Sequence, residues 1–217
     1  MVKDFAVIGL GRFGSSVARS LHSLGRSVLG VDKDEAIVNA ASEFTTKAVQ
    51  CDATDEQSLR ALGLRNVDVV VVALGDLQAS ILVTLFLKEI GVHNVIAKAA
   101  NEHHGKVLTK IGADRVVFPE QEMGKRVAHN LASSTILDLI ELSPQYSIVE
   151  LAAGKRLVGR NLQELDLRNR YGINVIGIRR GKDVNLMPKR DDVILHGDVL
   201  IIVGENGAIK NLEDESR

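Results

Sequence analysis

The sequence has little of several things, and each shortage removes a class of function. Cys51 is the only cysteine among 217 residues, so an internal disulfide and a site of several cysteine ligands are both excluded. Tryptophan is absent and aromatic residues make up 3% of the chain, which leaves aliphatic side chains to form the core. The longest apolar run, Val67 to Leu74, contains Asp68 and is far shorter than the ~20 residues of a membrane span.

The chain also lacks net charge. It has 27 basic and 28 acidic residues, a formal charge of −1, so no field of one sign favours nucleic acid or an anionic membrane, and no nucleic-acid partner is expected. The sequence begins without a signal pattern. We therefore expect a cytoplasmic protein that reaches a membrane only through a partner. Apolar residues are 45% of the chain and charged residues 25%, a composition typical of a globular protein with a substantial core.

The stretch from Phe5 to Gly14 organises the first half of the chain. Phe5 to Ile8 is an apolar run of strand-forming residues, and glycines follow at positions 9, 11 and 14 before an amphipathic stretch. This order of strand, glycine turn and helix is typical of a phosphate-binding loop. Gly9 is expected to make the tight turn, Gly11 to let the backbone approach a phosphate, and Gly14 to allow close packing of the helix. Free N–H groups at the helix N-terminus favour an anion there.

An acid stands where the ribose of an adenosine needs one. Asp32 ends a second apolar strand, about twenty residues beyond the glycine loop. A carboxylate at that position can accept hydrogen bonds from both ribose hydroxyls and repels a 2′-phosphate. The combination predicts adenine-nucleotide binding. The alternative is that Asp32 is a solvated strand end.

Strands and helices alternate regularly over the first 120 residues. Strict alternation of this kind predicts an α/β fold with a doubly wound parallel (Rossmann-like) sheet. The expected helix 79–90 holds more apolar residues than one core-facing stripe needs, which favours a contact with another subunit over deep burial alone. The expected strands cover residues 5–8, 28–31, 47–52, 69–74, 94–99 and 115–118.

The second half of the chain follows a different pattern. Residues 121–142 are expected to form one long helix that Pro144 ends. The domains predicted are thus a nucleotide-binding domain, residues 1–120, a crossover or linker helix, residues 121–143, and a small C-terminal α+β domain, residues 147–217. In this last domain we expect a helical stretch at 161–167, a polar tail that frays from Asn211, and strands at 147–151, 173–179, 192–195 and 199–203.

The candidate site residues lie where the predicted strands end, because a doubly wound sheet binds its ligand outside the carboxyl ends of its strands. Asp52 is placed to meet the adenine edge, or is an acid at a helix N-terminus, and the two interpretations are compatible. The residues predicted to contact the nucleotide are Gly9, Gly11, Arg12, Phe13, Gly14, Asp32, Lys33, Asp52, Ala53, Ala73, Lys98 and Glu120.

Two charged residues of this set suggest more than a dinucleotide. The guanidinium of Arg12 suits the extra negative charge of ATP or of a neighbouring subunit's nucleotide, unless it is a solvated surface arginine. The carboxylate of Glu120 would repel phosphates unless a divalent cation, Mg²⁺ or Ca²⁺, lies between them. The alternative for Glu120 is a surface helix cap.

Enzyme chemistry has little support in the sequence. No nucleophile stands in a recognisable catalytic frame. A nicotinamide-dependent dehydrogenase needs a proton donor in its substrate domain, and the residues after Pro144 offer only His196 and scattered lysines. A nucleotide sensor that turns nothing over is the preferred interpretation, and an NAD(H)-dependent oxidoreductase or NAD(H)-sensing module is the alternative.

Several motifs together resemble the RCK (KTN) domains of Ktr-type regulatory subunits of bacterial potassium uptake systems. They are the glycine loop, Asp32, and the segments 51–55, 98–99 and 111–120, and the resemblance covers essentially the whole chain. It implies a non-enzymatic cytoplasmic regulator at the inner face of the cell membrane. It also implies a homodimer that assembles into an octameric ring on a membrane potassium translocator, with ATP favouring the active ring and ADP the inactive one.

The resemblance implies roles for individual residues as well. The three glycines, Asp32 and Asp52 would bind the nucleotide. Arg12 would contact the γ-phosphate across the dimer, and Glu120 would help to hold the divalent cation. The stretch from 168 to 178 resembles a cyclic di-AMP site, with Arg168 and Asn174 as candidate contacts. Cys51 departs from the family pattern, which has glycine before this aspartate.

Overall fold

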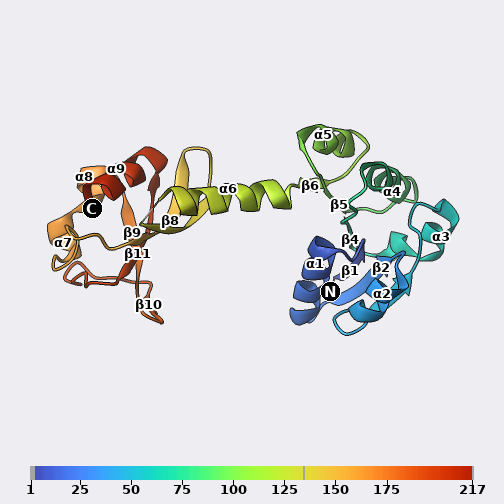
Figure 1. Cartoon of the computed structure of the whole chain (residues 1–217), viewed down its shortest axis with the longest axis horizontal. Helices are drawn as coiled ribbons and strands as arrows, with labels where there is room; N and C mark the ends of the chain where they lie inside the picture. Colours follow the sequence, from blue (N-terminus) through green and yellow to red (C-terminus); the bar gives the residue numbers. More distant parts are fainter. Residues whose placement is uncertain (1–2, 134, 217) are drawn as a thin grey trace. The chain divides into compact units, whose positions relative to one another are not determined.

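The computed structural model describes residues 3–133 and 135–216. The chain divides into two compact units, Met1–Gln121 and Glu122–Arg217 (Figure 1).

The first unit is built on one parallel sheet. Its strands are β1 (Asp4–Ile8), β2 (Ser27–Asp32), β3 (Lys47–Gln50), β4 (Val69–Val72), β5 (Val95–Lys98) and β6 (Arg115–Val117). Its helical segments are α1 (Arg12–Ser23), α2 (Glu35–Ala41), α3 (Glu56–Ala61), η1 (Leu64–Asn66), α4 (Leu77–Glu89) and α5 (Glu102–Lys110). The strand order is β3-β2-β1-β4-β5-β6, so the winding reverses between β1 and β4. The predicted doubly wound sheet is confirmed.

Different helices cover the two faces of this sheet. In β4, Val69 and Val71 belong to the core under α1 and α2, whereas Val70 and Val72 belong to the core under α3, α4 and α5. All four valines are buried, which explains why β4 shows no polar alternation. The second core is completed from α4 by Val83. The sheet is therefore a central layer between two layers of helices.

The second unit holds an antiparallel sheet of five strands in the order β10-β9-β11-β8-β7. The strands are β7 (Ile136–Glu141), β8 (Tyr146–Ala152), β9 (Asn174–Arg180), β10 (Asp183–Asn185) and β11 (Val199–Glu205). The helices are α7 (Leu162–Leu165), α8 (Leu167–Tyr171) and α9 (Asn206–Ser216), and α6 (Pro119–Ala132) leads into the unit. Leu151, Leu200, Leu165 and Leu212 meet in one core between the sheet and these helices. The predicted small C-terminal α+β domain is confirmed.

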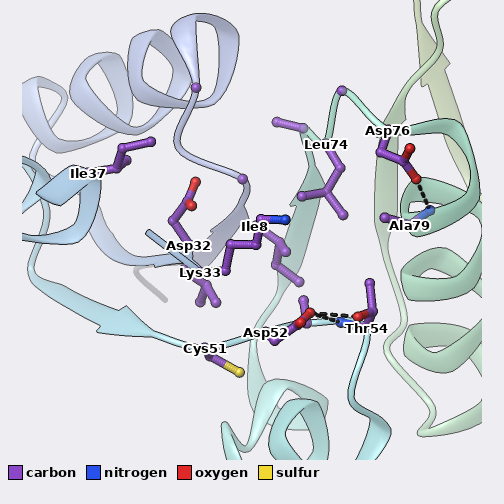
Figure 2. A pocket seen from close by; sticks show the side chains of 16 residues that line it. Ile8, Asp32, Lys33, Ile37, Cys51, Asp52, Thr54, Leu74, Asp76 and Ala79 are labelled. Carbon is purple, nitrogen blue, oxygen red and sulfur yellow. Dashed lines mark hydrogen bonds between the residues drawn. The ribbon is translucent and has the colours of Figure 1, made fainter. Parts of the chain in front are cut away.

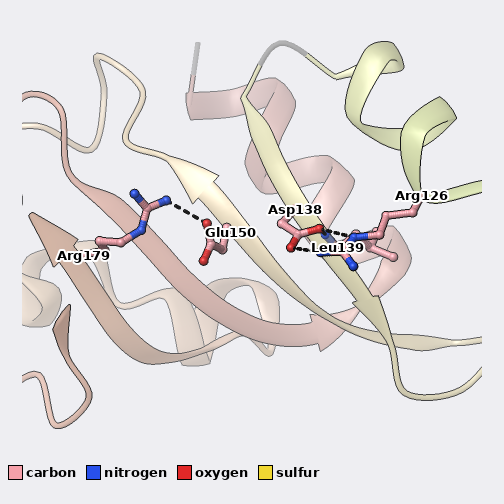
Figure 3. A network of polar contacts seen from close by, with 5 residues as sticks. All are labelled: Arg126, Asp138, Leu139, Glu150 and Arg179. Atoms are coloured by element: carbon pink, nitrogen blue, oxygen red, sulfur yellow. Dashed lines mark hydrogen bonds and ion pairs between the residues drawn. The ribbon is translucent and has the colours of Figure 1, made fainter. Parts of the chain in front are cut away.

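Two ion pairs stabilise the second sheet on the face opposite to its core (Figure 3). Arg126 of α6 bonds both carboxylate oxygens of Asp138 on β7. Arg179 of β9 reaches over β11 to Glu150 of β8, with 2.7 Å between Nη2 and Oε2. The first pair fixes the middle of α6 to the edge strand, and the second joins strands that do not pair directly.

The expected helix over residues 121–142 is wrong in its second half. Helix α6 ends at Ala132, and residues 136–141 form strand β7 beside β8. The Ser133 hydroxyl accepts hydrogen bonds from the N–H groups of Thr135 and Ile136, so the side chain takes donors that a helix would use. Pairing with β8 then supplies the partners for an extended backbone.

Two further expectations for the second unit are corrected. Residues 192–195 form no strand and contribute only an isolated bridge between Val193 and Asn161. Residues 211–216 belong to α9 and do not fray, because the helix buries Ile209 and Leu212 against the sheet.

Candidate functional site

The glycine loop lies between β1 and α1, at the point where the winding of the sheet reverses. Gly9 has φ +87°, and a Cβ there would lie 3.0 Å from the Ala73 carbonyl group. A Cβ on Gly14 would lie 1.8 Å from the Gly9 carbonyl oxygen, whereas a Cβ on Gly11 would meet nothing within 4 Å. Two glycines therefore permit the close approach of loop, helix and β4, and the third leaves open space beside the helix N-terminus.

The carboxylate of Asp32 holds this loop in place. Its Oδ2 accepts a hydrogen bond of 2.7 Å from the N–H group of Leu10, and its Oδ1 accepts one of 3.0 Å from the N–H group of Asp34. Each oxygen retains a further lone pair, and Asp32 also lines the adjoining pocket. The residue is thus a structural link between two loops as well as the predicted ribose acceptor.

A pocket of about 330 Å³ lies along the carboxyl ends of β1 to β4. Figure 2 shows the side chains that line it, which come from the ends of these strands and from the first turns of α2 and α4. Its walls are mostly apolar, with Ile8, Ile37 and Leu74 among them. The apolar walls suit the flat ring of a base, and the glycine loop at one side suits phosphates.

Asp52 and Cys51 stand at the β3 side of the pocket. Oδ1 of Asp52 accepts hydrogen bonds from the hydroxyl and the N–H group of Thr54, at 2.6 and 2.9 Å. These bonds, with a smaller contribution from the Lys33 ammonium, lower the pKa of Asp52. Burial raises the pKa of the Cys51 thiol, and the charges of Asp52 and Asp55 raise it further. Asp52 is therefore a carboxylate acceptor and Cys51 a neutral, weakly nucleophilic thiol at neutral pH.

Arg12, Lys98 and Glu120 form a second group of charges at the same edge of the sheet. The Lys98 ammonium lies 2.7 Å from Oε1 of Glu120. This hydrogen bond is the main reason that the pKa of Glu120 is lowered, and the guanidinium of Arg12 adds to the effect through space. The group carries two positive charges and one negative charge, so an anion is attracted to it.

The residues of one chain fit a divalent cation only in combination with phosphates. Among the described residues, no group of three or more His, Cys, Asp or Glu side chains could hold a metal ion. Mg²⁺ is usually bound by one or two carboxylates together with substrate phosphates. Glu120, whose side chain is 68% exposed, fits the part of that single carboxylate.

The second unit has its own hollow, of about 520 Å³. Arg168 and Asn174 both line it, together with the cationic residues Lys189 and Arg190. Asp166, also in the lining, has the left-handed backbone conformation with φ +44°. The two residues predicted for a second ligand are therefore neighbours in one positively charged hollow.

The structure brings most, but not all, of the predicted nucleotide residues together. The pocket is lined by Gly9, Gly11, Asp32, Lys33, Asp52, Ala53 and Ala73, whereas Arg12, Phe13, Gly14, Lys98 and Glu120 do not line it. Lining residues outside the predicted set are Ile8, Val31, Ile37, Cys51, Thr54, Leu74, Gly75, Asp76 and Ala79. Most of these follow the ends of strands, so the strand ends in the sequence were a signal for them.

Comparison with known proteins assigns both units. The TrkA-N domain family matches residues 5–119 and the TrkA-C domain family matches residues 146–216. The Ktr system potassium uptake protein C of Bacillus subtilis (strain 168) is 50% identical over 98% of this chain and 97% of its own length. The Ktr system potassium uptake protein A of the same organism is 45% identical over 98% of this chain and 96% of its own.

Solved structures of the GsuK channel share the fold. The structure described as the GsuK channel bound to NAD has a TM-score of 0.69 and 21% identity over 98% of this chain. The structure of GsuK bound to ADP has a TM-score of 0.51 and 27% identity over 59% of this chain. The chain corresponds to 39% and 33% of those two channel chains, respectively. Within the described residues, no helix is both long and apolar enough to cross a membrane.

Proposed function

The chain belongs to the family of RCK (KTN) proteins with TrkA-N and TrkA-C domains, and we propose that it is a nucleotide-sensing regulatory subunit of a potassium uptake system. The observation that carries this proposal is a pocket at the point of the first unit where the winding of the sheet reverses. It occurs in a chain that is 50% identical to a Ktr system potassium uptake protein. Both of the relatives described above are named for potassium uptake and neither for an enzymatic activity, which supports a regulator over a dehydrogenase.

The nucleotide proposed is ATP in exchange with ADP. The glycine loop and Asp32 suit a phosphate chain and an adenosine ribose, and GsuK, with 27% identity, was solved with ADP. NAD(H) is the alternative ligand, since it shares the adenosine half of the molecule. Arg12 and Glu120, outside the pocket, are proposed to act on the terminal phosphate and on a divalent cation next to it.

Assembly of the chain into a homodimer and an octameric ring is part of the proposal. Helix α4 leaves Leu82 and Leu85 each 36% exposed, and α6 exposes Met123, Val127 and Leu131 at four-residue spacing. These stripes suit contacts between copies. Moving a two-state ring from mostly closed to mostly open takes about 5.5 kcal/mol, which is under about one kcal/mol for each of eight subunits. That amount is well within what one contact from Arg12 to a γ-phosphate could supply.

The partner proposed is a membrane potassium translocator. The chain would act at the cytoplasmic face of the membrane, where a change in ring shape opens or closes the translocator. The gating direction, ATP for the active ring and ADP for the inactive one, follows the family resemblance.

The hollow of the second unit is proposed as a site for cyclic di-AMP. Arg168, Lys189 and Arg190 provide positive charge for two phosphates, and Asn174 provides an amide that can bond a base edge. Replacing Arg168 by Ala should weaken cyclic di-AMP binding at least tenfold and leave ATP binding in the first unit unchanged.

Equilibrium binding of ATP, ADP, NAD and NADH, with light scattering on the same samples, tests the proposed function. Tight binding of ATP and ADP to an octamer, with different small-angle scattering profiles in the two states, is the expected result. Preference for NADH on a dimer, with an absorbance change on addition of small carbonyl compounds, would support the dehydrogenase instead. Identical scattering profiles with ATP and ADP would contradict the gating proposal.

A further inference from the structure

Lys98 and Glu120 neutralise each other at the edge of the nucleotide sheet. Lys98 is the last residue of β5, opposite Val117 on β6, and Glu120 lies in the first turn of α6. The short connection from β6 to α6 therefore brings the two side chains together, 2.7 Å apart. The Lys98 side chain is only 16% exposed, so its ammonium is held close to the carboxylate.

The two residues have opposite preferences for a nucleotide. A lysine ammonium attracts a phosphate directly, whereas a carboxylate repels one unless a cation lies between them. When they are paired, neither group is available for its own partner. A divalent cation that arrives with a phosphate can take the place of the ammonium at the carboxylate.

We propose that Lys98 is a built-in competitor of the divalent cation at Glu120, and that it sets how strongly the cation enhances ATP binding. This inference rests on the proposed function, because it describes the regulation of the same nucleotide site. Without a divalent cation, Lys98 occupies Glu120 and shields the phosphates from it. With the cation, Glu120 changes partner and its ion pair with Lys98 is lost.

The structure supplies a matched control for this pair. Lys88 of α4 forms a similar ion pair with Asp114, at 2.9 Å, and its side chain is 24% exposed. Asp114 precedes β6, at the end of the strand opposite to Glu120. Replacing Lys88 by Met removes the same kind of pair from the same unit without touching the site.

The test is calorimetric titration of the full chain with ATP, once with EDTA and once with excess Mg²⁺. The ratio of the two dissociation constants is the measured quantity. For Lys98→Met this ratio is expected to rise about fivefold over the wild-type value, the upper range for a partly exposed ion pair. For Lys88→Met and for Lys98→Arg, which keeps the charge, the ratio should stay within about twofold of the wild type. Glu120→Gln should reduce the ratio to near one, both in the wild-type chain and in the Lys98→Met variant.

An unchanged ratio in a folded Lys98→Met protein, checked by its thermal melt, would overturn the inference and leave nucleotide sensing intact. A wild-type ratio near one, with tight ATP binding, would do the same. Failure of the wild-type chain to bind any nucleotide would instead overturn the proposed function, and the inference with it.

Discussion

The carboxylate of Asp32 and the N–H group of Leu10 are joined by a hydrogen bond of 2.7 Å. This bond connects the end of β2 to the glycine loop. The other carboxylate oxygen of Asp32 accepts a hydrogen bond from the N–H group of Asp34. The residue that the sequence marks as a ribose acceptor thus also sets the shape of the loop that we propose to hold the phosphates. We therefore expect ligand binding and loop stability to be coupled through this one side chain.

Replacing Asp32 by Ala should therefore weaken ATP, ADP and NAD alike, by at least about tenfold, and lower the free energy of unfolding by about 2 kcal/mol. Asp34→Ala is the matched control. Asp34 caps α2 by accepting hydrogen bonds from Ala36 and Ile37, so its loss should cost about 1 kcal/mol of stability and leave nucleotide affinity unchanged. Nucleotide titration and urea unfolding of both variants check this. Equal affinity in the Asp32 variant and the wild type would contradict the placement of the ribose.

Cys51 offers a chemical readout of the pocket. It lines the pocket and is the only cysteine of the chain. Burial, followed by the charges of Asp52 and Asp55, raises the pKa of its thiol, so maleimide labelling should be slow at pH 7 and rise about tenfold per pH unit up to pH 9. Saturating ATP or ADP should slow labelling at least tenfold, as mass spectrometry of the intact protein would show. Cys51→Ser gives the blank. Labelling at the same rate with and without bound ATP would place the nucleotide elsewhere.

Acid pH should destabilise the first unit through His104. Its Nδ1 accepts a hydrogen bond from the N–H group of Ala100, and its buried Nε2 has no hydrogen-bond partner among the described residues. Burial lowers the pKa of His104 below 6.5. Because the unfolded chain takes up the proton first, the stability contribution is complete above pH 6.5 and is lost as the pH falls, by at most about 1.4 kcal/mol per pH unit.

Urea unfolding between pH 7.5 and 5 measures this slope. His104→Gln should remove it, since an amide oxygen can accept the bond from Ala100 without titrating. His103→Gln, at the exposed neighbouring position, should leave it unchanged. A slope that persists in the His104 variant would assign the pH dependence to other groups.

The local chemistry of the first unit made much of it predictable. The glycines, Asp32 and the uninterrupted apolar run of β4 each have few structural alternatives, and their spacing indicated the parallel sheet and the edge where the pocket lies. The pairing of Lys98 with Glu120 was not predictable in this way. It depends on β5 and β6 being neighbours in the sheet, which no local pattern in the sequence records.

The second unit shows where periodicity misleads. The apolar residues between Val127 and Leu139 fit a continuous helix, but the Ser133 hydroxyl bonds the N–H groups that follow it, and β8 offers a strand partner. The Ser133 hydroxyl also donates to Glu213 of α9, a buried carboxylate in a stretch whose polarity suggested a fraying tail. The first error arises from a side chain and a neighbouring strand that compete with the helix, and the second from contacts such as that between Ser133 and Glu213, which are 80 residues apart in the chain. In both cases tertiary contacts outweigh local preference.

Two of the three loop glycines, Gly11 and Gly14, can be separated experimentally. Gly11 has φ −65°, and an added Cβ meets nothing within 4 Å, yet the residue lines the pocket. Gly11→Ala should therefore fold normally, because the gain of about 0.4–1 kcal/mol from the restricted unfolded chain is offset by alanine being the poorer N-cap residue of α1. ATP and ADP should bind at least about tenfold more weakly, because a methyl group occupies the phosphate approach. Gly14→Ala should behave in the opposite way. Its Cβ would lie 1.8 Å from the Gly9 carbonyl oxygen, so the protein should lose at least about 3 kcal/mol or fail to fold. Gly124→Ala, where an added Cβ meets nothing within 4 Å, is the control for glycine replacement in a helix.

If Gly11→Ala bound ATP as tightly as the wild type, the phosphates would have to lie away from the loop, and Asp32 would remain only as its structural support.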